Sequence, residues 1–204
     1  MKKIIAIALL LALLLTLGAC GKQQEKRVGG WTLSEDGAVT DEAQAAFDKA
    51  LDGLVGVSYQ TVALLGTQLV SGTNYSFLCE AAVVYPDAQP YYAVVTVYEN
   101  LQGEAEIRNI VTLDLGQIAE SGVVENAAAP DGQSLGGWTV DRESSAETEG
   151  AVLHLASQVV SGTKHCVLCK GWTLTFVYEN LEGKTEILKT APLDIAALAQ
   201  SAEA

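Results

Sequence analysis

The same pattern occurs twice in this chain, and an internal repeat constrains a fold more than any single motif does. Three segments of the first half return in the same order in the second half: 29–32 as 136–139, 68–73 as 158–163, and 97–103 as 177–183. They read Gly-Gly-Trp-Thr, Gln-x-Val-Ser-Gly-Thr and Val-Tyr-Glu-Asn-Leu-x-Gly. The second copy is shorter on both sides of its Gln motif. We therefore expect two copies of one structural unit, the second of them truncated.

The first twenty residues have the order of a secretory signal. Lys2 and Lys3 precede an uninterrupted apolar run at 4–15, which as a helix is too short to cross a hydrocarbon core of ~30 Å. Leu-Gly-Ala-Cys at 17–20 resembles the bacterial lipobox, in which the Cys thiol is acylated and becomes the mature N-terminus. We therefore expect an extracytoplasmic lipoprotein, anchored in the cell membrane through Cys20. A plain signal that ends at Ala19 is the alternative.

The charge balance excludes some function classes. The 204 residues include 25 Asp and Glu but only 12 Lys and Arg, and the formal net charge is -13. Such a chain is poorly suited to a phosphate backbone, so we expect no nucleic-acid partner. No nucleophile elbow or phosphate-binding Gly-rich loop occurs, and His154 and His165 have no evident nucleophile partner. We expect no enzyme, no catalytic residue, no cofactor and no metal site.

The periodicity of the first copy predicts one helix and then four strands. Thr40 is a good helix N-cap, and the residues after it place an apolar stripe on one face: Ala43, Ala46, Phe47, Ala50, Leu51 and Leu54. The predicted strands, separated by turn residues, are 59–70, 75–84, 91–98 and 104–113. The second copy has no comparable stripe after Trp138, so another segment must cover its sheet. Residues 194–202 are one candidate for this cover.

These motifs, in this order, resemble the cystatin family and most closely its stefin branch. The resemblance is carried by Gly-Gly near the mature start, one amphipathic helix, a strand that ends in Gln-x-Val-x-Gly before Thr-Asn-Tyr, and a later Leu-x-Gly turn. It covers residues 29 to about 115, and again 136 to about 195 without the helix. It implies an α+β fold: a cystatin-like antiparallel sheet wrapped on one helix, followed by a second, truncated cystatin-like repeat that lacks the helix.

The repeat and the signal together predict five segments. They are a lipoprotein signal peptide at 1–19, a tether at 20–28, repeat one at 29–117, a linker at 118–135 and truncated repeat two at 136–204. The nine residues from Cys20 to Gly29 reach at most ~32 Å when fully extended. Because this keeps repeat one close to the membrane, we expect repeat two or a released form to be the better placed for binding a large partner.

The function that the resemblance implies is reversible, wedge-type inhibition of papain-like cysteine proteases at the cell surface. Carried over residue by residue, the protease-binding edge of repeat one is Gly29, Gly30, Gln68, Leu69, Val70, Ser71, Gly72, Leu101, Gln102 and Gly103. In repeat two it is Gly136, Gly137, Gln158, Val159, Val160, Ser161, Gly162, Leu181, Glu182 and Gly183. The alternative is a non-inhibitory cystatin-like binding or scaffolding module of the cell envelope. An inhibitor needs Gly30, Val70 and Gly72 specifically, whereas a scaffold tolerates changes there.

Three cysteines remain besides Cys20, and three cannot all pair within one chain. Cys79 and Cys169 hold equivalent positions in the two copies and lie on apolar alternations, which favours buried free thiols. Cys166 and Cys169 are spaced as Cys-x-x-Cys, but on a strand they point to opposite faces, so neither a disulfide nor a shared metal fits. A Cys79–Cys169 bridge between the copies stays open.

Overall fold

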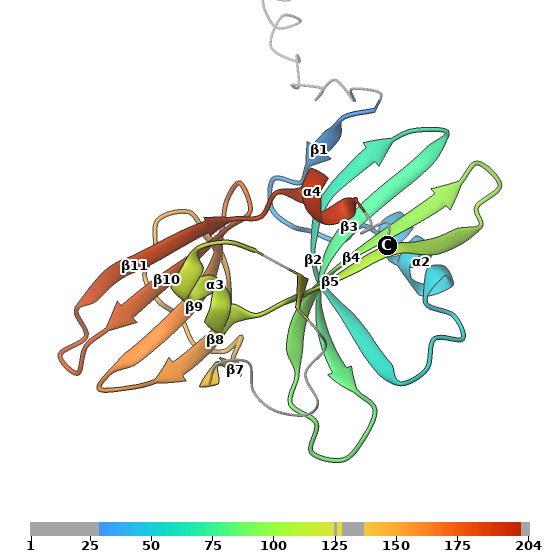
Figure 1. Ribbon diagram of the computed structural model, residues 1–204. Helices are drawn as coiled ribbons and strands as arrows, with labels where there is room; N and C mark the ends of the chain where they lie inside the picture. The colour runs from blue at the N-terminus through green and yellow to red at the C-terminus, as the bar shows by residue number, and fades with distance from the viewer. Residues whose placement is uncertain (1–28, 125, 128–136, 201–204) are drawn as a thin grey trace, which may run out of the picture.

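A computed structural model describes residues 29–124, 126–127 and 137–200. The predicted signal peptide, Cys20, the tether and Gly136 lie outside the described residues. Eleven strands and three helices follow one another along the described chain (Figure 1). In order they are β1 Trp31–Leu33, α2 Asp41–Ala50, β2 Val57–Leu69, β3 Gly72–Val83, β4 Tyr91–Asn100, β5 Ala105–Leu113, α3 Leu115–Ser121, β6 Asn126–Ala127, β7 Thr139–Val140, β8 Ala151–Val159, β9 Thr163–Cys169, β10 Thr173–Glu179, β11 Thr185–Pro192 and α4 Ile195–Ala199.

Each repeat forms its own antiparallel sheet. The first sheet has six strands in the order β1-β2-β3-β4-β5-β6, and the second has five in the order β11-β10-β9-β8-β7. Thr40 caps α2, because its side chain accepts a hydrogen bond from the backbone N–H of Ala43. The predicted helix and the predicted strands of repeat one are therefore confirmed within a few residues at their ends.

The prediction of an α+β fold, with one sheet wrapped on one helix and a truncated repeat after it, is wrong. Of the described residues, 50% lie in strands and only 14% in helices, and the strands form two sheets that pack on each other. The helix covers only one face of the first sheet, while the second sheet covers the other. The sequence of β4 indicated this burial, since residues 91–97 are apolar except for Thr96, and all seven are buried in the structure. A continuous apolar run indicates burial on both faces, not on one.

Two hydrophobic clusters lie on opposite faces of the first sheet. On one face, α2 contributes Ala43, Ala46 and Phe47, which pack against Phe77 and its neighbours. On the other face, the larger cluster joins both sheets, with Leu65, Tyr92 and Leu113 from repeat one packed with Leu155, Phe176 and other residues of repeat two. The molecule therefore has three layers: α2, the first sheet and the second sheet. The cover that the second sheet needs comes from repeat one.

The helix that follows each repeat packs on the sheet of the other repeat, as in two halves related by an approximate twofold axis. Helix α3, which follows repeat one, lies against β11, whereas α4, which follows repeat two, lies against β4 and β5 (Figure 1). Asn109 Nδ2 donates to the carbonyl of Leu198 in α4 at 2.7 Å, and at the equivalent position Lys189 Nζ donates to the carbonyl of Glu120 in α3 at 2.5 Å. The prediction that residues 194–202 cover the second sheet is therefore wrong, because α4 packs on the first sheet; residues 201 and 202 lie outside the described residues.

The backbones of the two repeats agree even in their irregularities. The β2–β3 ladder shifts register twice, between Thr61 and Ala63 and between Leu64 and Gly66. The β8–β9 ladder shifts at the equivalent two places, and the β4–β5 and β10–β11 ladders share one further shift, before Val97 and Val177 respectively. Because bulges bend a strand, this agreement shows that both repeats adopt one curved backbone. The repeats differ in their side chains, in α2 and in the connection between β3 and β4, which is longer than that between β9 and β10.

The three cysteines of the described chain are free and buried, as predicted. Cys166 belongs to the core between the sheets, and Cys169 to a small cluster with Ala146 and Val167 on the outer face of the second sheet. Burial raises the pKa of the thiols of Cys79 and Cys166, which makes both poor nucleophiles near neutral pH. They are packing residues.

Candidate functional site

Three of the predicted binding segments of repeat one meet at one end of the first sheet. The β2–β3 turn and the β4–β5 turn are neighbours, since Gly72 pairs with Asn100 across the β3–β4 ladder. The N-terminal segment joins them, because the backbone N–H of Gly29 donates to the carbonyl of Leu69 at 2.9 Å. We call this surface loop edge one; it consists of Gly29, Gly30, Leu69–Gly72 and Leu101–Gly103.

The β2–β3 turn of loop edge one is held by its neighbours on β4. The hydroxyl of Tyr98 donates to the carbonyl of Ser71 at 3.1 Å. A Cβ atom on Gly72 would lie 2.2 Å from the carbonyl oxygen of Glu99 and 2.8 Å from the Tyr98 ring, so only glycine fits there. Repeat two has the same arrangement. The hydroxyl of Tyr178 donates to the carbonyl of Ser161, and a Cβ atom on Gly162 would lie 2.3 Å from the carbonyl oxygen of Glu179. The fold itself therefore explains the repeated glycine and tyrosine of these motifs.

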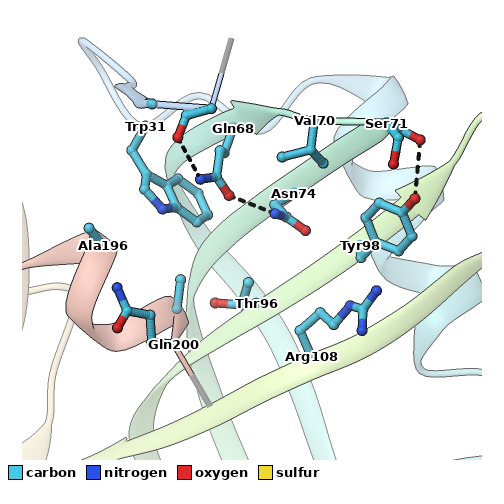
Figure 2. A pocket seen from close by; sticks show the side chains of 13 residues that line it. Trp31, Gln68, Val70, Ser71, Asn74, Thr96, Tyr98, Arg108, Ala196 and Gln200 are labelled. Atoms are coloured by element: carbon cyan, nitrogen blue, oxygen red, sulfur yellow. Dashed lines mark hydrogen bonds between the residues drawn. The ribbon is translucent and has the colours of Figure 1, made fainter. Parts of the chain in front are cut away.

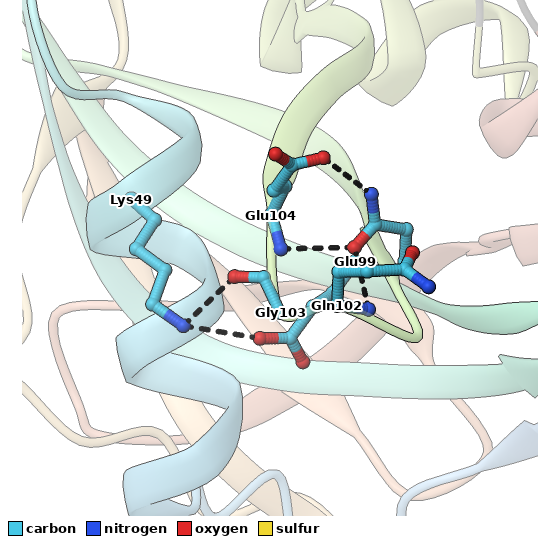
Figure 3. A network of polar contacts seen from close by, with 6 residues as sticks. Lys49, Glu99, Gln102, Gly103 and Glu104 are labelled. Carbon is cyan, nitrogen blue, oxygen red and sulfur yellow. Dashed lines mark hydrogen bonds and ion pairs between the residues drawn. The ribbon is translucent and has the colours of Figure 1, made fainter.

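The β4–β5 turn is held by an asparagine and a lysine (Figure 3). Asn100 Oδ1 accepts from the backbone N–H groups of Gln102 and Glu104 at 2.9 and 3.0 Å. Lys49 of α2 reaches across to the carbonyl of Gly103 at 3.1 Å and to the Glu99 carboxylate at 3.3 Å. Asn180 holds the equivalent turn of repeat two in the same way, but there α2 and its lysine have no counterpart. The turn is thus ordered before any partner arrives.

The side chains at the tips of these turns are apolar and exposed, and they do not contribute to the core of the fold. Leu101 is 79% exposed, while Leu69 and Val70 are each 38% exposed. Loop edge two, which consists of Gly137, Val159–Gly162 and Leu181–Gly183, shows the same feature, with Val159 84% and Leu181 89% exposed. Figure 1 shows the two loop edges at opposite ends of the molecule. Apolar side chains on rigid turns are typical of surfaces that bind another protein.

Gln68 has a structural role at loop edge one and is not free for a partner (Figure 2). Its Nε2 donates to the carbonyl of Gly29 at 3.0 Å, and its Oε1 accepts from Asn74 Nδ2 at 2.7 Å. The side chain therefore ties the N-terminal segment to the β2–β3 hairpin. Of the predicted binding residues in repeat one, the exposed tips are the ones that the structure leaves available for contact.

A pair of histidines on the outer face of repeat two was missed by the sequence analysis. His154 Nε2 lies 3.0 Å from His165 Nδ1, and both side chains are buried. His154 Nδ1 contacts the carbonyl of Asp141, and His165 Nε2 lies 3.4 Å from the Glu179 carboxylate. Burial lowers the pKa of His165, as does the neighbouring His154, while Glu179 acts in the opposite direction. The equivalent residues of repeat one, Leu64 and Tyr75, pack under α2, which repeat two lacks.

Comparisons with known proteins found no match, either among family models, curated proteins or solved structures. The resemblance to cystatins therefore rests on the residues quoted above. Among the described residues, no helix has the length and apolar character needed to cross a membrane. Within the same residues, no group of three or more His, Cys, Asp and Glu side chains is arranged to hold a metal ion.

Proposed function

We propose that loop edge one binds in the cleft of a papain-like cysteine protease and blocks it reversibly. The observation that supports this proposal is the meeting of three segments, far apart in the sequence, at one end of the sheet with exposed apolar tips. The chain makes and breaks no covalent bond in this role. Inhibition comes from occupying the cleft, so that a substrate cannot reach the catalytic thiol.

Each part of loop edge one has a defined task in this proposal. The side chains of Leu69, Val70 and Leu101 supply apolar area, and full burial of such a side chain contributes about 1.5–3 kcal/mol. Gly29 and Gly30 have no side chains, so the backbone there can approach the floor of a cleft closely. The bonds from Tyr98, Asn100 and Lys49 have already fixed the turns, which reduces the conformational entropy lost on binding.

The test is a titration of the soluble mature chain, carrying Cys20→Ser, against papain with a small fluorogenic substrate. We expect inhibition, and we expect Val70→Asp to weaken it by roughly 100-fold or more, because an unpaired carboxylate is strongly disfavoured in an apolar cleft. Val160→Asp tests loop edge two in the same assay. Val84→Asp is the matched control, since Val84 is 69% exposed on the β3–β4 connection, away from both loop edges.

Two results decide between inhibition and the alternative function. If Val70→Asp or Val160→Asp abolishes inhibition while Val84→Asp does not, loop edge one or two respectively is the inhibitory surface. If the folded chain inhibits none of several papain-like enzymes, the protease proposal fails. The non-inhibitory binding or scaffolding module then becomes the leading function, and the partner would be sought among cell-envelope proteins.

The position of the proposed anchor predicts a further effect on cells. A tether of nine residues from Cys20 to Gly29 holds loop edge one near the membrane, where a protease has little room. Inserting a long Gly/Ser linker after Cys20 should therefore increase the inhibition of an added protease by intact cells. Equal inhibition with the short and the long tether, at equal surface amounts of the protein, would contradict this crowding effect.

A further inference from the structure

A pocket of about 570 Å³ lies behind loop edge one, between the face of β3, β4 and β5 and the helix α4 (Figure 2). Trp31, Tyr98 and Arg108 line its sides, Thr96 lies on the sheet face, and Ala196 and Gln200 close it from α4. Its volume falls within the range of small-molecule sites. Gly29, Gly30, Val70 and Ser71 of loop edge one also line the pocket, so a ligand there would share these residues with a partner on loop edge one.

The charge of this pocket is opposite to that of the chain. The protein carries a formal net charge of -13, yet the residues that line the pocket include Arg108 and no Asp or Glu. The Arg108 guanidinium lies over the Tyr98 ring at 4.7 Å from its centroid. Its Nη2 is 3.0 Å from Glu106 Oε1, but both side chains of this pair are more than half exposed, so a ligand can displace the glutamate. A guanidinium presents paired donors that fit a carboxylate.

A buried threonine hydroxyl lies on the sheet face of this pocket. Thr96 is 2% exposed, and its Oγ1 has no hydrogen-bond partner among the described residues. Buried hydroxyls are nearly always hydrogen-bonded, because an unmet donor or acceptor destabilises the fold. An unmet hydroxyl on a pocket wall is therefore available to a ligand.

Repeat two fills the equivalent space with hydrophobic side chains. Phe176 stands where repeat one has Thr96, and its ring packs edge to face on Trp138 with centroids 5.5 Å apart. Trp138 is consequently 5% exposed, whereas its equivalent, Trp31, is only partly buried and lines the pocket. Leu188 replaces Arg108. Because the backbones share the same bulge here, the smaller side chain of Thr96 leaves open the space on the sheet face that Phe176 fills in repeat two.

We propose that this pocket binds a small ligand that bears a carboxylate and an apolar or aromatic part. Arg108 pairs with the carboxylate, the Thr96 hydroxyl forms a hydrogen bond, and the exposed part of the Trp31 ring contacts the apolar part. A free peptide C-terminus and an acidic sugar share this chemistry. The proposal does not rest on protease inhibition, since binding of a small acid in this pocket is measured without any protease.

The test is NMR titration of the ¹⁵N-labelled mature chain carrying Cys20→Ser. The probes are the tripeptide Ala-Ala-Phe, the same peptide with a C-terminal amide, glucuronate and glucose. We expect saturable shifts at Trp31, Thr96 and Arg108 with one or both free acids, and no binding of the neutral counterpart. Binding of the peptide acid alone or of glucuronate alone identifies the source of the carboxylate.

Three variants make the outcome decisive. Arg108→Gln should weaken the binding of the acid at least tenfold, while Arg142→Gln, which removes a similarly exposed arginine outside the pocket, should leave it unchanged. Thr96→Phe introduces the phenylalanine that repeat two has at the equivalent position, 176. Because its ring would fill the pocket, this variant should abolish binding of the acid and raise the melting temperature of the protein. Equal binding of acid and amide, no binding of any probe at millimolar concentration, or binding unaffected by Arg108→Gln and Thr96→Phe would overturn the proposal.

Discussion

Gly72 and Gly162 occupy positions where the neighbouring strand leaves no room for a side chain. The close approach of Gly72 to the backbone of Glu99 and to the Tyr98 ring fixes the shape of the β2–β3 turn. This gives the glycine of the Gln-x-Val-Ser-Gly motif a structural role whatever the partner is. The exposed side chains of the motif are Leu69 and Val70, which precede this glycine, and these are the ones to which the proposed function assigns binding.

Gly72→Ala should destabilise the protein by about 1–3 kcal/mol, as overpacking of a filled space does. Ser71→Ala is the matched control, because the backbone carbonyl that accepts from Tyr98 remains, and we expect it to change the free energy of unfolding by less than about 0.5 kcal/mol. Urea unfolding followed by circular dichroism measures both. Similar free energies for Gly72→Ala and the wild type would show that β3 and β4 separate easily.

His165 should make the stability of repeat two depend on pH. Burial and His154 lower its pKa in the folded protein below the ordinary value of 6.5. Below pH 6.5 the unfolded chain therefore binds more protons at this residue than the folded chain does. The free energy of unfolding must fall as the pH drops through this range. Asp141 does not contribute there, since hydrogen bonds, first of all with Ser144, lower its pKa to about 2.

The measurement is urea unfolding at pH 7.5 and pH 5.5 for the wild type and for His165→Gln, which cannot titrate. We expect the wild type to lose more stability between the two pH values than the variant does. Groups that do not contact His165 contribute equally to both proteins, so the difference between the two losses reports on His165 together with its contacts to His154 and Glu179. The same loss in both proteins would mean that His165 titrates with its ordinary pKa in the folded state.

At the scale of the element, α2 is the clearest difference between the repeats. In repeat one it buries Phe47, whose ring packs edge to face on Phe77 with centroids 5.0 Å apart. In repeat two the equivalent face of the sheet carries the two histidines and the small cluster of Ala146, Val167 and Cys169. The face that has no helix on it is thus more polar in repeat two, and it is buried by contacts that include Asp141 on His154 and Ala146 on Val167 and Cys169.

Phe47→Ala should destabilise the protein by about 3–5 kcal/mol, because Phe47 is 3% exposed and its removal leaves a cavity between α2 and the sheet. Leu54→Ala, just after the helix, is the control, since Leu54 is 43% exposed. We expect the control to lose less than about 1 kcal/mol. Thermal and urea unfolding distinguish the two variants. A small effect of Phe47→Ala would show that α2 is only loosely attached to the sheet.

At the scale of the whole molecule, each sheet buries one of its faces against the other sheet. The side chains of repeat two that are most deeply buried, among them Leu155, Trp172 and Phe176, lie in the core that both sheets share. The hydroxyl of Tyr92 in repeat one also donates to the carbonyl of Leu155 at 2.8 Å, which links the sheets by a buried polar contact. The reciprocal positions of α3 and α4 join the repeats further.

Residues 136–204 expressed alone should therefore not form a stable monomeric fold. We expect poor dispersion in NMR spectra or self-association in light scattering, because the core face of the second sheet would be exposed to water. The full chain should unfold in one cooperative transition when heated. A monomeric fragment with a dispersed spectrum and a cooperative transition of its own would contradict the shared core.

Local patterns in the sequence determined the local structure. The N-cap at Thr40, the period of the apolar residues after it and the turn residues between the strands predicted α2 and β2 to β5, since these signals act over a few residues. The repeat predicted that both halves would share one backbone. The resemblance of the motifs to those of cystatins predicted that the segments of loop edge one lie together, but it did not separate Gln68, a structural residue, from the exposed tips.

Only the tertiary structure decided how the two repeats pack. An apolar face of a strand shows that it needs a cover, but it does not specify whether a helix, a tail or another sheet supplies it. The contacts of Leu65 with repeat two, and the pocket that α4 closes over Thr96, bring together residues that are far apart in the sequence. They arise from the packing of one sheet on the other and from the side chains that differ between two equivalent backbones, which no local pattern encodes.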